Sequence, residues 1–145
     1  MSISSRIART SVEPGVAADL SATRNGLLTR VALLFFSAIF AFGGYNQIRY
    51  APSHVSRAEE AGLPVSENLV RVNGAGMLLA VLGLQIPALR RASAALLALQ
   101  LPVTTYVGHR FWEQETGPQR AAQLTQFLKN VSLFGAAVYI AGTSE

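Results

Sequence analysis

The sequence predicts an all-α protein, a transmembrane four-helix bundle whose third helix is kinked by a proline. Three observations predict this class. Of the 145 residues, 50% are hydrophobic and only 14% are charged, against roughly 25% charged residues in a soluble domain. The apolar residues gather in four bands, three of which carry no charge over 17 or 18 residues. A helix of about 18 residues is about 27 Å long, which nearly matches the roughly 30 Å hydrocarbon core of a bilayer.

The chain is expected to divide into a leader and one membrane domain. Residues 1–25 are polar and rich in Ser, Ala, Arg and Thr, and Pro14 and Gly15 interrupt them. They therefore predict a flexible N-terminal leader. The four-helix membrane domain is predicted over residues 26–145.

The first helix of this domain is predicted over residues 26–48. Its apolar core follows Arg30 and ends near Tyr45 and Tyr50, and these side-chain types suit the two membrane interfaces. The prolines, histidine and charged residues of 51–68 then predict an extramembrane loop.

The second and third helices are predicted over residues 67–89 and 92–108. Arg90 and Arg91 separate them, and so short a connection predicts a tight hairpin. Pro102 is expected to kink the third helix, because proline has no N–H to donate to the preceding turn.

The fourth helix is predicted over residues 119–141, which places both termini on one side of the bilayer. The arginines outside the membrane are more numerous on that side, so the positive-inside rule predicts a multi-pass protein of the inner (plasma) membrane with cytoplasmic N- and C-termini. The count leaves out Arg71 and Lys129, which are assigned to the membrane. The terminal side holds Arg6, Arg9, Arg24, Arg30, Arg90 and Arg91, and the other side holds Arg49, Arg57, Arg110 and Arg120.

The composition excludes several classes of function. Without cysteine the chain offers no disulfide, thiolate nucleophile or iron–sulfur ligand set, and its two histidines do not favour a haem held by two histidines. The net charge of +4 is spread over termini and loops without a basic stripe, so no nucleic-acid partner is expected. Since no metal-ligand spacing and no catalytic motif stands out, neither a metal site, a covalently bound cofactor nor catalysis by the chain alone is expected.

Polar residues near the starts of the second and fourth helices, and in the loop before the fourth, are expected to converge at the outer mouth of the bundle. Ionisable groups at membrane depth are costly unless they reach the surface or a partner, which singles out Arg71 and Lys129. The candidate ligand-binding residues are Arg71, Asn73, His109, Trp112, Glu113, Lys129 and Asn130.

Two interpretations of these residues are open. Arg71 and Lys129 can extend to the lipid headgroups with a glutamate as counter-charge, and Trp112 can be an ordinary interfacial aromatic residue. Alternatively, the same residues line a ligand pocket. The adjacency of His109, Trp112 and Glu113 in the sequence is what favours the pocket.

Three stretches of the chain read VRVNGAGMLLAVLGL, PVTTYVGHRFWE and QFLKNVSLFGAAV. They resemble the actinobacterial branch of the DoxX family, most specifically at Gly108–Trp112 and Phe127–Asn130, and the resemblance extends over residues 27–143. It implies a four-helix integral membrane protein with cytoplasmic termini. The candidate site residues that match the family are His109, Trp112, Lys129 and Asn130.

Two positions depart from the family pattern. Many members carry a glutamate early in the second helix, where this chain has Asn73, and a lysine after the glycines of the first helix, where it has Asn46 and Gln47. Both differences weaken the transfer of a proton relay or a charge pair from the family to this chain.

Members of the family are linked to membrane oxidoreductase assemblies, including thiosulfate:quinone oxidoreductase, and to resistance to oxidative stress. The resemblance implies an accessory subunit of a membrane redox complex, with the lipid bilayer and other membrane or membrane-associated subunits as partners and a quinone or a lipid as ligand. Two alternatives stay open: a small transporter or channel for an anionic or hydrophobic solute, and a purely structural subunit of a larger respiratory or photosynthetic assembly.

Overall fold

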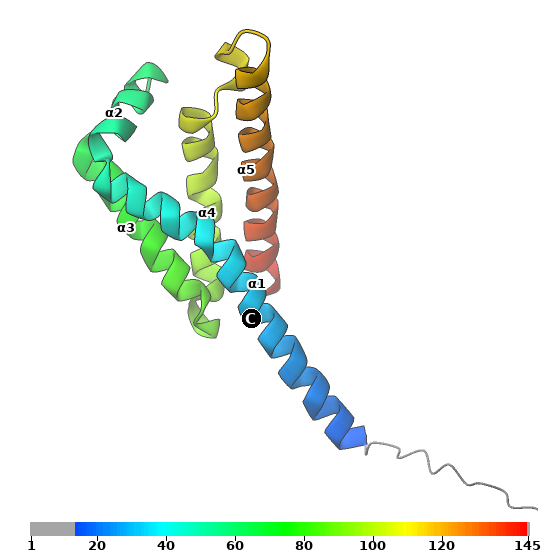
Figure 1. Cartoon of the computed structure of the whole chain (residues 1–145). Coiled ribbons are helices and arrows are strands. Elements are labelled where there is room, and N and C mark those ends of the chain that lie inside the picture. The colour runs from blue at the N-terminus through cyan, green and yellow to red at the C-terminus, as the bar shows by residue number, and fades with distance from the viewer. Residues whose placement is uncertain (1–13, 145) are drawn as a thin grey trace, which may run out of the picture. The chain divides into compact units, whose positions relative to one another are not determined.

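A computed structural model describes residues 14–144, and these residues form helices without any strand, which confirms the all-α class. Leu33–Glu145 form one compact unit, and the described residues of the other unit, 14–32, are helical throughout. The elements, labelled in Figure 1 where space allows, are α1 (Pro14–Arg49), α2 (Ala51–Glu60), α3 (Glu67–Leu84), α4 (Pro87–Gly108), the 3-10 helix η1 (Phe111–Glu113) and α5 (Pro118–Thr143).

The start of α1 differs from the flexible leader predicted over residues 1–25. Residues 1–13 lie outside the described residues, and residues 14–25 belong to the helix. Pro14 is the first described residue of α1, and residues 14–25 are helical where an interruption was expected.

The segment expected as an extramembrane loop contains the ten-residue helix α2. Pro52 lies in its first turn, which again suits a helix start. Ala51 and Ala58, seven residues apart and thus on one helical face, are the buried residues of α2. The prolines and charged residues of this segment had suggested a loop, but the segment forms a short amphipathic helix.

Pro87 sets the boundary between the second and third long helices of the described chain. α3 ends at Leu84, earlier than predicted, and α4 begins at Pro87, earlier than predicted. Because the residue before a proline avoids the helical region, Ile86 is extended, with φ −101° and ψ 114°. Arg90 therefore lies in α4 and not between helices, and its Nε donates to the carbonyl oxygen of Leu84 at 3.1 Å.

Pro102, the residue expected to kink the third helix, lies inside α4, which continues as one helix to Gly108. The hydroxyl of Thr104 donates to the carbonyl oxygens of Gln100 and Leu101 at 3.0 and 3.1 Å. The proline does not divide the helix.

The helices α1 and α3 cross at two glycines. A Cβ atom built on Gly44 would lie 2.8 Å from the carbonyl oxygen of Gly74, and one built on Gly74 would lie 2.7 Å from the carbonyl oxygen of Gly44. Only glycine leaves room for backbones this close, an arrangement frequent where membrane helices pack.

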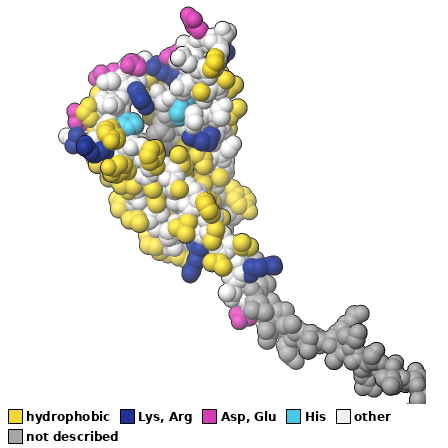
Figure 2. Space-filling model, viewed as in Figure 1, with side chains coloured by type: hydrophobic (Ala, Val, Ile, Leu, Met, Phe, Trp, Pro, Cys, Tyr) yellow, Lys and Arg dark blue, Asp and Glu magenta, His cyan; other side chains and the backbone are white. Residues whose placement is uncertain are grey.

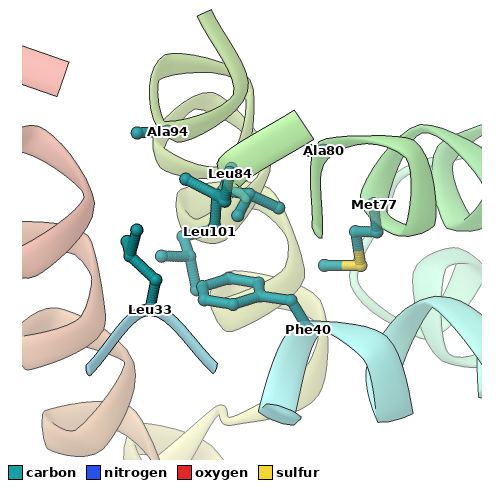
Figure 3. Close-up of a cluster of buried hydrophobic side chains, with 8 residues drawn as sticks. Leu33, Phe40, Met77, Ala80, Leu84, Ala94 and Leu101 are labelled. Carbon is teal, nitrogen blue, oxygen red and sulfur yellow. The ribbon is translucent and has the colours of Figure 1, made fainter. Parts of the chain in front are cut away.

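A hydrophobic core joins the long helices within the compact unit (Figure 3). Leu133, Ile140 and Ala141 of α5 are partly buried against it. Ser37 of α1 accepts from Gln85, just after α3, whereas Gln47 later in α1 accepts from Asn73 early in α3, so these two helices run antiparallel. The buried members of the core are Leu33, Phe40, Met77, Ala80, Leu84, Ala94, Leu97 and Leu101.

The buried positions of the bundle are often small, whereas many exposed positions are large and apolar. Ala94 and Ala137 are fully buried, while Phe35 is 80% exposed, Leu99 75% and Tyr139 70%. Among the described residues, one segment, Ala22–Arg49 of α1, is long and apolar enough by itself to cross a bilayer. In α3, α4 and α5 polar side chains interrupt the apolar stretches.

Candidate functional site

A cavity of about 470 Å³ lies at the end of the bundle that carries α2. Its wall comes from the second half of α1, from α2 and the loop after it, from the first half of α3, the second half of α4 and part of α5. Figure 2 shows this hollow with the two histidine side chains on either side of it and basic side chains nearby. The topology thus brings five helices to one site.

Three amide side chains from three helices form a hydrogen-bonded chain in the wall of the cavity. Nε2 of Gln100 donates to the backbone oxygen of Asn73 at 3.2 Å and to its Oδ1 at 3.0 Å. Nδ2 of Asn73 donates to Oε1 of Gln47 at 2.7 Å, and Nε2 of Gln47 donates to the sulfur of Met77 at 3.7 Å. Since the backbone oxygen of Asn73 can only accept, it determines the orientation of every amide in the chain.

This orientation leaves one buried acceptor, Oε1 of Gln100, without a donor among the described residues. A buried polar atom without a partner costs about 1–3 kcal/mol. Gln100 lines the cavity, but this oxygen atom is itself buried away from it.

The ionisable side chains that line the cavity are all basic or imidazole: His54 and Arg57 from α2, His109 at the end of α4 and Lys129 from α5. No lining residue is an aspartate or a glutamate. Arg57 forms no ion pair with any described residue, and Lys129 donates to the amide oxygen of Gln126. The site therefore presents positive charge and hydrogen-bond donors to its contents.

His54 is held largely neutral by its surroundings. Burial lowers the pKa of its imidazole below the usual 6.5, and the neighbouring Arg57 cation lowers it further, while a hydrogen bond with the backbone of Asn46 acts in the opposite direction. An anion bound beside His54 and Arg57 would offset part of the effect of the Arg57 cation and so favour the protonated form of His54.

The far wall of the cavity is apolar. Phe40, Met77 and Leu101 line it and are also buried members of the hydrophobic core. The cavity thus ends on packed side chains, which suits the binding of an amphiphilic molecule better than passage through the bundle.

Four of the seven candidate residues line this cavity: Asn73, His109, Lys129 and Asn130. Nδ1 of His109 lies 3.1 Å from Oε1 of Gln123, so with that oxygen as acceptor Nδ1 carries the proton. Nδ2 of Asn130 donates to the hydroxyl of Thr105 at 3.0 Å, which ties α5 to α4.

Arg71 and Glu113 lie outside the cavity, each in an ion pair. Arg71 donates to Glu67, one turn earlier on α3, at 2.9 Å. Glu113 lies 3.0 Å from Arg110, whose guanidinium also donates to the backbone oxygen of Glu60 at 2.8 Å. The side chain of Arg71 has its counter-charge, and Arg110 ties α2 to the loop around η1.

Trp112 also lies outside the cavity, in an aromatic cluster between α4, η1 and α5. Its ring stacks on Tyr106 with centroids 5.9 Å apart, and it meets the rings of Phe111 and Phe127 edge to face at 5.2 and 6.1 Å. These contacts join the end of α4 to the start of α5 and account for the tryptophan without a ligand.

Six further polar residues line the cavity and were not among the candidates, namely Asn46, Gln47, His54, Arg57, Gln100 and Thr104. A glutamine inside an apolar band, as at Gln100, is a signal available from sequence alone. His54 and Arg57 were assigned to a loop, and only the formation of α2 brings them to the site.

Comparison with known protein families, with curated proteins and with solved structures finds no match to this chain. Among the described residues, no three or more histidine, cysteine or carboxylate side chains gather where they could hold a metal ion. The cavity and its charges are therefore what a functional proposal can rest on.

Proposed function

We propose that the chain is an integral membrane protein of four transmembrane helices, whose bundle binds an amphiphilic molecule and supports a membrane redox complex as an accessory subunit. The cavity carries this proposal, because it combines polar donors on one side with an apolar wall on the other. Ligand pockets in proteins have this composition and a volume of about 300–1,000 Å³.

The distribution of side chains supports placement in a bilayer. Water-soluble proteins rarely expose large contiguous apolar patches, yet Val72 and Leu79 of α3 are each 68% exposed, and α4 and α5 present comparable side chains. Small buried residues with large apolar residues outside are typical of helices that pack against each other in lipid.

The lengths of the helices support four crossings. α3 has 18 residues, α4 has 22 and α5 has 26, and about 18 residues span about 27 Å. The polar residues that lower the hydropathy of α3 lie in its first two turns, Glu67 to Asn73. There they can meet headgroups or face the cavity, as the polar residues of membrane helices usually do.

The redox role rests on the resemblance to the DoxX family. An accessory role also fits the lack of cysteine in the sequence, which leaves the chain no thiol and no cysteine ligand for an iron–sulfur cluster. A quinone or a lipid is the ligand class that the cavity suits, with the polar end at its donors and the apolar part along Phe40 and Met77.

The proposal is tested by extracting the full chain from its native membrane in polymer-bounded lipid discs. A redox enzyme subunit and a bound isoprenoid or lipid are expected to copurify, detectable by mass spectrometry. Val107→Phe narrows the cavity and should deplete the bound molecule, whereas Val72→Phe, at an exposed position outside the cavity, should not.

Two results would contradict the proposal. One is extraction with neither a redox partner nor a bound amphiphile. The other is solute uptake into liposomes containing only this chain, lost on Lys129→Met, which would favour the transport alternative.

A further inference from the structure

We propose that the molecule held in the cavity is an anionic lipid, whose acidic headgroup binds Arg57 and Lys129 and whose chain leaves the cavity along exposed apolar residues of α1 and α4. This inference rests on the proposed membrane function and names the ligand class.

The charge distribution around the cavity supports an anionic headgroup. Arg71 and Arg110, at the same end of the bundle but outside the cavity, each have a glutamate partner, at 2.9 and 3.0 Å. Arg57 and Lys129 line the cavity and have none among the described residues. A cation without a built-in partner beside a cavity free of carboxylates attracts an anion, and charge-assisted hydrogen bonds are the strong ones.

The hydrogen bonds inside the protein disfavour a neutral ligand such as a quinone. Quinone oxygens need donors, and each of the side-chain amide nitrogens of Gln47, Asn73, Gln100 and Asn130 already uses at least one of its two N–H groups within the protein. The strongest donors left for a ligand are the cationic groups of Arg57 and Lys129. An acidic group meets them better than a carbonyl, since both the charge and the hydrogen bonds are satisfied.

The apolar part of the cavity provides a route for the lipid chain. Ile39 and Phe42 of α1 and Leu99 and Val103 of α4 line the cavity and are also exposed at the surface of the bundle. In a bilayer this edge faces hydrocarbon, so a chain can pass from the cavity into the membrane over apolar side chains. A volume of about 470 Å³ then has to hold only the headgroup and the first part of the chain.

The test uses the full chain in detergent micelles, titrated by calorimetry with dioctanoyl phosphatidylglycerol, dioctanoyl phosphatidylcholine, decylubiquinone and inorganic phosphate. Only the phosphatidylglycerol is expected to bind well. Arg57→Gln and Lys129→Gln should each weaken its binding about tenfold, the loss of one charge-assisted contact. Arg71→Gln, which also removes one positive charge, should change it less than about twofold.

Each outcome separates this inference from the function on which it rests. Equal binding of decylubiquinone or phosphatidylcholine, unaffected by the two variants, would overturn the anionic ligand and leave an amphiphile-binding bundle. Inorganic phosphate binding as tightly as the lipid would show a free-anion site and overturn the role of the chain. If no amphiphile binds, both proposals fail. Arg57→Lys restores the charge, so recovered binding would exclude misfolding as the cause of the loss.

Discussion

Asn73 is the side chain that connects the walls of the cavity. From α3 it accepts from Gln100 of α4 and donates to Gln47 of α1, so one residue joins three helices. The neutral amide can donate and accept at once, which an ionised carboxylate cannot, and the orientation of the whole amide chain depends on that property.

The substitution Asn73→Ala should therefore destabilise the bundle. It removes both side-chain hydrogen bonds and leaves Oε1 of Gln47 without its donor, at an expected cost of about 1–3 kcal/mol. Thermal unfolding of the purified chain in lipid discs measures the loss. The matched control is Asn68→Ala, an exposed asparagine of the same helix, which should change stability by less than about 0.5 kcal/mol. An unchanged melting temperature for Asn73→Ala would show that the amide chain does not hold the helices together.

His54 should titrate below pH 6.5. Its pKa is lowered mainly by burial and further by Arg57, so the folded state binds this proton less readily than the unfolded state. The stability that neutral His54 contributes is full above pH 6.5 and is lost as the pH falls below that value through the lowered pKa. A histidine-selective NMR titration measures the shift, and His54→Gln should remove this part of the pH dependence of unfolding.

An anion in the cavity should raise the pKa of His54 again. The other ionisable groups around the cavity are Arg57, His109 and Lys129, and a bound phosphatidylglycerol headgroup would offset the repulsion from the Arg57 and Lys129 cations. The same titration in the presence of dioctanoyl phosphatidylglycerol provides the measurement. A pKa that the lipid leaves unchanged would place its headgroup away from His54.

At the scale of the elements, the glycine crossing of α1 and α3 determines how closely the cavity walls approach. Gly44 and Gly74 put the two backbones in contact, and Gln47 and Asn73 lie beside that contact on the same two helices. Their hydrogen bond of 2.7 Å is therefore a consequence of the backbone approach.

The substitution Gly44→Ala should separate these helices. Its Cβ would lie 2.8 Å from the backbone oxygen of Gly74, which cannot turn away as a flexible side chain can. An overpacked contact of this kind costs about 1–3 kcal/mol. Gly135→Ala on α5 is the control, since no atom lies within 4 Å of the added Cβ and alanine is the better helix former by up to about 1 kcal/mol. Equal thermal stability of the two variants would contradict a close α1–α3 contact.

At the scale of the whole molecule, the proposed topology has four crossings and both termini in the cytoplasm. Reporter domains fused in turn to the N- and C-termini should both be active on the cytoplasmic side, and a reporter inserted after Gly62, in the loop that follows α2, should be active only outside. Opposite locations for the two termini would require an odd number of crossings and would contradict the four-crossing topology. Neutralising Arg90 and Arg91 together should weaken the orientation of the protein in the membrane, since both lie near the start of α4, close to its short connection with α3.

Several features followed from the sequence alone. The helical class, the long apolar bands and the candidates Asn73, His109, Lys129 and Asn130 depend on local composition and on polar residues placed in apolar surroundings, and both can be seen in a linear chain. The helix α2 was missed because a proline is taken as a helix breaker until its position in the first turn is known.

The make-up of the site depended on tertiary structure. Arg71 and Lys129 look equivalent in the sequence. In the structure Arg71 forms an ion pair with Glu67, one helical turn away, whereas Lys129 lines a cavity that has no carboxylate in its wall. His54 and Gln47 are far from His109 and Gln100 along the chain. All four line one cavity only because the helices are antiparallel and α1 contacts α3 at two glycines. The packing of distant segments against each other decides which polar groups line the same cavity, and the linear order of residues does not reveal this packing.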